Sequence, residues 1–372
     1  MGVQTGQEEF FKMDKNEMAD SSKNKIEKMV QKKYGKKRTN EAFVYAKRIK
    51  SILEKMVVEG IGDASIKASI LKIVDKRPEI LMAQIGNHRY NLGMIAADLK
   101  AEWFVLKALE HKDASLQQDY IGENIGMHAA QARLERATLK ALDNTNASVQ
   151  QDCIGENIGM YAAHAKLELA TLKALENIDA SVQKNIAGQN IGMFAAKSGL
   201  ESATIKALEN AEASVQQDYK GRNIGMYAAR EGLEQATLKA LENIDASVQQ
   251  DELGDNIGMI AADMGLEQAT IKALDNPEAS VQQSVSGWNI GMCAAESALE
   301  EATLKAIKNP VARSQKNYLQ NTIKTIARGA GLASVVKAYD DLAQNETSKK
   351  KKYIRKEPHD LTIDEIEQEL GF

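Results

Sequence analysis

An asparagine returns along this chain every 33 residues, and the residues around it return with it. One copy of the repeated unit is Asn223–Asp255, NIGMYAAREGLEQATLKALENIDASVQQDELGD. The full copies open at Asn91, Asn124, Asn157, Asn190, Asn223, Asn256 and Asn289. A fixed period of this size indicates one supersecondary unit stacked many times, rather than a single globular core. The chain is therefore predicted to be a repeat array.

Each unit predicts two helices and then a finger. The opening asparagine is a good N-cap, and a glycine such as Gly232 allows a tight turn after the first helix. The second helix has an apolar stripe at helical spacing, formed by Leu233, Ala236, Ala240 and Leu241. We expect this helix to end at Asn243, which tolerates the left-handed conformation of a C-cap. ASVQQD then forms an extended arm, and Asp251–Gly254 forms a turn into the next unit.

This unit resembles the ankyrin repeat over roughly residues 91–320. The paired alanines at the end of the first helix, G-L-E into the second helix and D-x-x-G before the next copy all match that family. The 33-residue period matches too. The family's T-P-L-H is replaced here by N-I-G-M, and G-A-D by x-A-S. The resemblance implies an all-α repeat solenoid, a helix-turn-helix-finger array with N- and C-terminal capping repeats, whose concave face binds proteins.

Five segments are predicted from these patterns. They are a disordered polar and basic segment at 1–38, an N-terminal capping repeat at 39–90, seven repeats at 91–321, a C-terminal capping repeat at 322–345 and a charged tail at 346–372. The first helix of the N-terminal cap is expected to bury Phe43, Ala46, Ile49, Leu53, Met56 and Val57. The tail ends in an amphipathic stretch that is expected to dock on a partner through Leu361, Ile363, Ile366 and Leu370.

Charge and cysteine usage restrict the partners and the compartment. The net charge is −4, and the negative charge lies in the array while the N-terminal segment is basic. An acidic array is a poor binder of nucleic acid. Cys153 and Cys293 lie four repeats apart, so they cannot pair within one chain, as fits a reducing compartment. We find no membrane span and no signal peptide, and expect a soluble cytoplasmic monomer.

The chemical motifs considered favour structural roles. A methionine ladder runs along the repeats (Met94, Met127, Met160, Met193, Met226, Met259 and Met292) and is interpreted as core packing rather than as a metal or cofactor site. The glycine at the third position predicts close backbone approach between adjacent repeats. His128 and His164 lie in adjacent repeats, but without carboxylate or thiol partners no zinc site is expected. With no catalytic motif present, neither an enzyme nor a cofactor is predicted.

Positions that vary between the copies are the candidates for binding. They lie on the first helix and at the fingertips, where aromatic and arginine side chains can anchor a protein partner. The candidate partner-binding residues are Tyr120, His128, Tyr161, His164, Phe194, Tyr219, Lys220, Arg222, Tyr227, Arg230 and Trp288. The alternative for the first-helix position of His128 and Tyr227 is that it packs against the finger.

The leading hypothesis is a non-catalytic scaffold that binds a protein on the concave face, centred on the third to fifth repeats. A second hypothesis is an ankyrin-repeat effector that an intracellular bacterium or parasite exports into a host cell. It draws on the acidic C-terminus, where Glu365, Glu367 and Glu369 precede Leu370 and Phe372. An enzyme is disfavoured because the segments flanking the array are too short to form a separate catalytic domain.

Overall fold

The structure is a computed structural model that describes residues 35–60 and 62–354, with side chains described as far as residue 346. Within these ranges the regular secondary structure is helical, apart from one isolated antiparallel bridge between Ile85 and Tyr90. The prediction of an all-α repeat array is confirmed. None of the described helices combines the length and the apolar character needed to cross a membrane. The chain divides into two compact units between Gln216 and Gln217.

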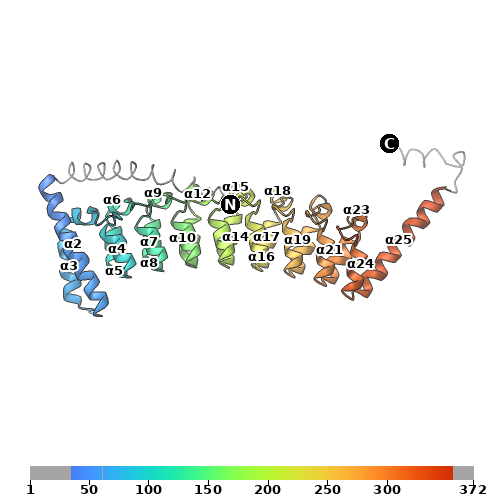
Figure 1. Cartoon of the computed structure of the whole chain (residues 1–372), viewed down its shortest axis with the longest axis horizontal. Coiled ribbons are helices and arrows are strands. Elements are labelled where there is room, and N and C mark those ends of the chain that lie inside the picture. The colour runs from blue at the N-terminus through green and yellow to red at the C-terminus, as the bar shows by residue number, and fades with distance from the viewer. Residues whose placement is uncertain (1–34, 61, 355–372) are drawn as a thin grey trace, which may run out of the picture. The chain divides into compact units, whose positions relative to one another are not determined.

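Unit 1 contains the N-terminal helix pair and the first repeats (Figure 1). Its helices are α2 (Lys36–Val58), α3 (Ala64–Lys76), the 3₁₀ helix η1 (Pro78–Met82), α4 (Leu92–Asp98), α5 (Glu102–Leu109), α6 (Lys112–Ser115), α7 (Ile125–Gln131), α8 (Glu135–Leu142), α9 (Thr145–Ser148), α10 (Ile158–His164), α11 (Glu168–Ala174), α12 (Ile178–Val182), α13 (Ile191–Lys197), α14 (Glu201–Leu208) and α15 (Ala211–Val215).

Unit 2 contains the remaining repeats and the last described helix. Its helices are α16 (Ile224–Arg230), α17 (Glu234–Ala240), α18 (Ile244–Ser247), α19 (Ile257–Asp263), α20 (Glu267–Ala273), the 3₁₀ helix η2 (Ala279–Val281), α21 (Ile290–Glu296), α22 (Glu300–Ala306), α23 (Pro310–Ser314), α24 (Ile323–Gly329) and α25 (Ala333–Ile354).

The opening asparagine of each repeat makes two kinds of hydrogen bond. In the repeat that begins at Asn223, its side-chain oxygen accepts from the N–H of Met226 at 2.9 Å, the N-cap bond predicted from the sequence. Its amide group also donates to the carbonyl of Ala246 and to the side chain of Gln249, at 2.9 and 2.8 Å. Serine or threonine could make the cap, but neither has a side-chain amide to donate to the finger. Asparagine therefore joins the first helix to its own finger.

The second asparagine of the unit does not cap the second helix, as the sequence had suggested. Helix α17 ends at Ala240, and Asn243 instead begins the short helix α18. Its φ of −88° is not left-handed, and its side chain accepts from the N–H groups of Asp245 and Ala246. The prediction of a C-cap was wrong because asparagine also satisfies the free N–H groups of a first helical turn. Each finger thus starts with one turn of helix and only then becomes extended.

Neighbouring repeats pack through the glycine at the third position. A Cβ added to Gly258 would lie 2.6 Å from the Cβ of Ala273 and 2.6 Å from the Cδ1 of Ile290 in the next repeat. The atoms that lie closest to the glycine therefore belong to side chains, whereas the sequence had predicted that the backbones of adjacent repeats approach each other. The methionine ladder is fully buried in this core, as its packing role requires.

The ends of the described chain differ from the central repeats. Helix α2 buries Ala42, Ala46, Ile49, Leu53 and Met56, whereas Phe43 and Val57 are 37% and 48% exposed. The prediction that those two are buried was wrong. The buried residues are spaced alternately four and three residues apart, so they form one narrow stripe, and Phe43 and Val57 lie beside it on an uncovered side of the helix. At the other end, α25 continues past residue 346. Most of the predicted disordered segment, the docking stretch and the acidic C-terminus lie outside the described residues.

Candidate functional site

The candidate residues are divided between the two units. Unit 1 holds Tyr120, His128, Tyr161, His164 and Phe194, and unit 2 holds Tyr219, Lys220, Arg222, Tyr227, Arg230 and Trp288. They come from the first helix of a repeat or from the fingertip, and in unit 2 also from the residue just before the opening asparagine.

At the fifth position of the repeat, His128, Tyr161 and Tyr227 contact carboxylates of the fingers. His128, Phe194 and Tyr227 are only 2%, 7% and 4% exposed, and Tyr161 is half-buried. A buried side chain presents little surface to a partner, and the contacts of His128, Tyr161 and Tyr227 instead help to position the fingers. His164, at the eighth position of its repeat, is exposed.

The buried carboxylate of Asp218 holds its own finger in unit 2 in place. The phenol of Tyr227 donates to Asp218 Oδ2 at 2.7 Å, and Arg222 donates to the same oxygen at 2.8 and 3.0 Å. Burial opposes ionisation of Asp218, but these hydrogen bonds outweigh it and lower the pKa of the carboxyl. Arg230 donates to Asp251 at 2.9 Å in the next finger. Three of the predicted binding residues thus organise fingers.

The fingertips themselves are exposed. Tyr120 is 52% exposed and Tyr219 is 69% exposed, while Trp288 instead packs on the core at the C-terminal end of unit 2. The same tips carry further exposed apolar side chains that are not among the predicted binding residues. The further exposed apolar side chains on the tips are Ile154 and Ile186 in unit 1, and Leu253, Val285, Tyr318 and Leu319 in unit 2. These residues occupy the thirtieth and thirty-first positions of the repeat, and the variation of those positions between copies could have marked them as candidates.

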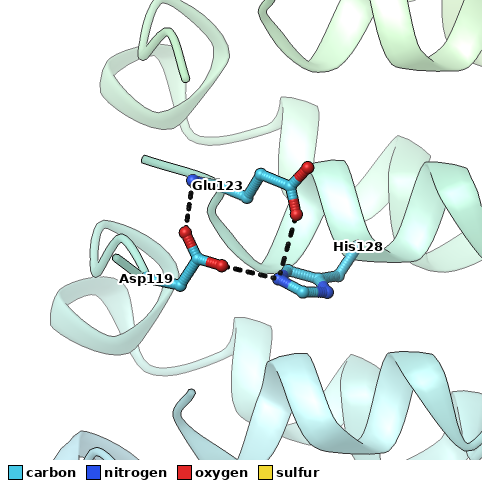
Figure 2. A group of neighbouring side chains, drawn as sticks. All are labelled: Asp119, Glu123 and His128. Carbon is cyan, nitrogen blue, oxygen red and sulfur yellow. Dashed lines mark hydrogen bonds and ion pairs between the residues drawn. The ribbon is translucent and has the colours of Figure 1, made fainter. Parts of the chain in front are cut away.

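Figure 2 shows a second kind of site in unit 1. Asp119 and Glu123, from one finger, and His128, from α7, turn their side chains toward one another. The Nε2 atom of His128 lies 3.5 Å from Glu123 Oε2 and 3.7 Å from Asp119 Oδ2. All three residues are buried, and among the described residues neither Nε2 nor Asp119 Oδ2 has a hydrogen-bond partner. No zinc site was expected at His128 because no carboxylate partner was evident in the sequence. The finger supplies two such carboxylates, Asp119 and Glu123.

The electrostatics of this cluster favour a positive charge. Burial alone would lower the pKa of His128, but the carboxylates of Asp119, Asp98 and Glu123 outweigh it and raise the pKa to about 9. The Nδ1 atom lies 2.9 Å from Asp98 Oδ1. Burial, together with neighbouring carboxylates, also raises the pKa of Tyr161, so its phenol stays protonated and donates to Glu123 Oε1 at 2.6 Å.

Comparison with known proteins does not assign a family. No protein-family model matches the chain, and no curated protein matches it. The molecule thus offers two candidate sites, the exposed fingertips and the Asp119–Glu123–His128 cluster.

Proposed function

We propose that the chain is a non-catalytic scaffold, ankyrin-like in architecture, that binds a protein partner through its fingertips. The observation that carries the proposal is the exposure of large apolar side chains at corresponding tips within one unit. In unit 2 these side chains are Tyr219, Leu253, Val285, Tyr318 and Leu319, which are 56–76% exposed. Exposed apolar patches on soluble proteins commonly mark interaction sites, and tyrosine is enriched among the residues that dominate binding.

The geometry of the tips does not depend on these side chains. Asp251 Oδ1 accepts the N–H groups of Leu253 and Asp255 at 2.9 and 3.1 Å, and Gly254 provides the left-handed residue of the turn with a φ of 77°. The N–H of Glu252 donates to the carbonyl of Lys220 on the preceding tip at 2.9 Å. A buried carboxylate and backbone bonds therefore fix the tip, while the side chain of Leu253 faces solvent. Burying one such side chain against a partner contributes about 1.5–3 kcal/mol.

The charges at the tips indicate the chemistry of the partner. Lys220 and Glu252 form an ion pair at 3.2 Å, so they offset each other's charge beside Tyr219. Such a surface favours a protein segment that presents aliphatic or aromatic side chains over a highly charged one. Screening by salt should weaken this binding little, because apolar contacts carry it.

Site-specific photo-cross-linking tests this proposal. A benzophenone amino acid placed at Leu253 should cross-link a discrete protein in the native cell extract. The same amino acid at Lys272, an exposed position on α20 of the same unit, should not. Equal cross-linking of that protein at both positions, or none at Leu253, would refute binding through the tips.

A further inference from the structure

We propose that Asp119, Glu123 and His128 form a binding site for one divalent transition-metal ion, and that Zn²⁺ is the ion that fits it best. The ligands are two carboxylate oxygens from one finger and one imidazole nitrogen from the helix that follows (Figure 2). This inference does not rest on partner binding at the fingertips.

Each carboxylate uses one oxygen for positioning and directs the other toward the imidazole. Asp119 Oδ1 accepts the N–H groups of Ile121 and Glu123 at 3.0 and 2.8 Å, which leaves Oδ2 without a hydrogen-bond donor among the described residues. Glu123 Oε1 accepts from the phenol of Tyr161 at 2.6 Å and from the amide of Gln131 at 2.8 Å. The remaining oxygen of Glu123 faces the imidazole. The ligand atoms are thus oriented before any ion arrives.

The separations between these atoms suit ligands around a common ion. Distances of 3.5 and 3.7 Å from Nε2 to the two carboxylate oxygens are too long for hydrogen bonds. Zinc bonds of about 2.0–2.1 Å in a tetrahedron place neighbouring ligand atoms about 3.3–3.4 Å apart. All three ligand atoms lie within 4.8 Å of one another. Small side-chain movements would therefore complete the coordination.

The other ring nitrogen of His128 is held as in many metal sites. It lies 2.9 Å from Asp98 Oδ1, and a histidine ligand commonly donates its second N–H to a carboxylate. In that tautomer the lone pair of Nε2 points at two carboxylates. Such an arrangement is repulsive unless a proton or a metal ion lies between them.

Other fingers show that the unpartnered oxygen is not a general feature of the repeat. In two equivalent aspartates the second oxygen accepts a hydrogen bond: Asp218 from a tyrosine and an arginine, and Asp251 from an arginine. Asp119 Oδ2 lacks such a donor among the described residues. The combination of two carboxylates with a histidine in place of the tyrosine distinguishes this finger from the others.

The ligand set selects among metals. An imidazole nitrogen suits Zn²⁺ and its transition-metal neighbours, whereas Mg²⁺ and Ca²⁺ prefer sites made of oxygen alone. Three protein ligands leave one tetrahedral position for a water molecule. The bound ion would tie the finger to α7, because its ligands come from both.

Calorimetry on the full chain, without an affinity tag and stripped of metal, tests the site with Zn²⁺ alone. We expect one ion per chain with a Kd in the micromolar range or tighter. His128→Tyr, Asp119→Asn and Glu123→Gln should each weaken binding about tenfold or more. The fold already accepts each of these residues at the same repeat position, as Tyr161, Asn185 and Gln189 show.

His164→Gln is the matched control, because Gln131 occupies that position in the preceding repeat. This variant should bind Zn²⁺ as the wild type does. The proposal is overturned if the wild type binds no more Zn²⁺ than His128→Tyr, or if His164→Gln weakens binding as much. Equal affinity for Mg²⁺ or Ca²⁺ would overturn the assignment to zinc.

Discussion

Replacing Gly258 by alanine should separate two packed repeats of unit 2. The new Cβ would lie 2.6 Å from both the Cβ of Ala273 and the Cδ1 of Ile290. Carbon atoms in good contact lie about 3.5–4.0 Å apart, so the helices must move by about 1 Å. Overpacking of this kind costs about 1–3 kcal/mol, and the higher helix propensity of alanine returns up to about 1 kcal/mol. We expect the free energy of unfolding to fall by about 1–2 kcal/mol.

Urea unfolding at 25 °C, followed by circular dichroism, measures this change. Gly329→Ala is the matched control, since Gly329 lies on a helix of the same unit and an added Cβ there meets no atom within 4 Å. The control should be as stable as the wild type or more stable by up to about 1 kcal/mol. If Gly258→Ala is as stable as the wild type, or if the control loses as much, the packing argument is refuted.

Three further variants test the electrostatics by urea unfolding. Tyr227→Phe should lose about 1–2 kcal/mol at pH 7, because the variant removes a donor to a buried carboxylate; an unchanged stability would contradict this. Asp255→Asn should gain about 1–2 kcal/mol at pH 7, because burial and neighbouring aspartates raise the pKa of Asp255 to about 6. That gain should vanish by about pH 4, and a gain independent of pH would argue against it. For His128 the folded pKa of about 9 exceeds the unfolded value, so metal-free protein should lose up to about 3 kcal/mol relative to His128→Tyr between pH 6.5 and 9. A flat difference would refute the charged imidazole.

The helical array could be predicted because its information is local and repeated. The opening asparagine, the paired alanines and the apolar stripe recur in each copy. A prediction that is ambiguous in one copy can therefore be decided from the others. The role of Asn243 was missed because the same side chain can end one helix or begin another. Only the backbone conformation, set by packing of the finger, decides between them.

The functional candidates were less predictable because they depend on contacts between positions that vary. Tyr227 and Arg222 looked like binding anchors, yet a shared contact with Asp218 explains their placement. His128 looked isolated because its carboxylate partners belong to the preceding finger and approach only when that finger turns back. Reading Asp119 and Glu123 of one finger together with His128, the fifth residue of the next repeat, would have indicated this contact.

Binding through the fingertips is tested most directly with the cross-linked partner. Once that partner is purified, its affinity is measured for the wild type and for a variant with polar fingertips. Tyr219→Ser, Leu253→Ser and Val285→Ser together remove three exposed apolar side chains without touching the buried framework. Their loss should weaken binding by about 100-fold or more, with the helical circular dichroism unchanged. Unchanged affinity in this folded variant would contradict the claim that the fingertips bind the partner.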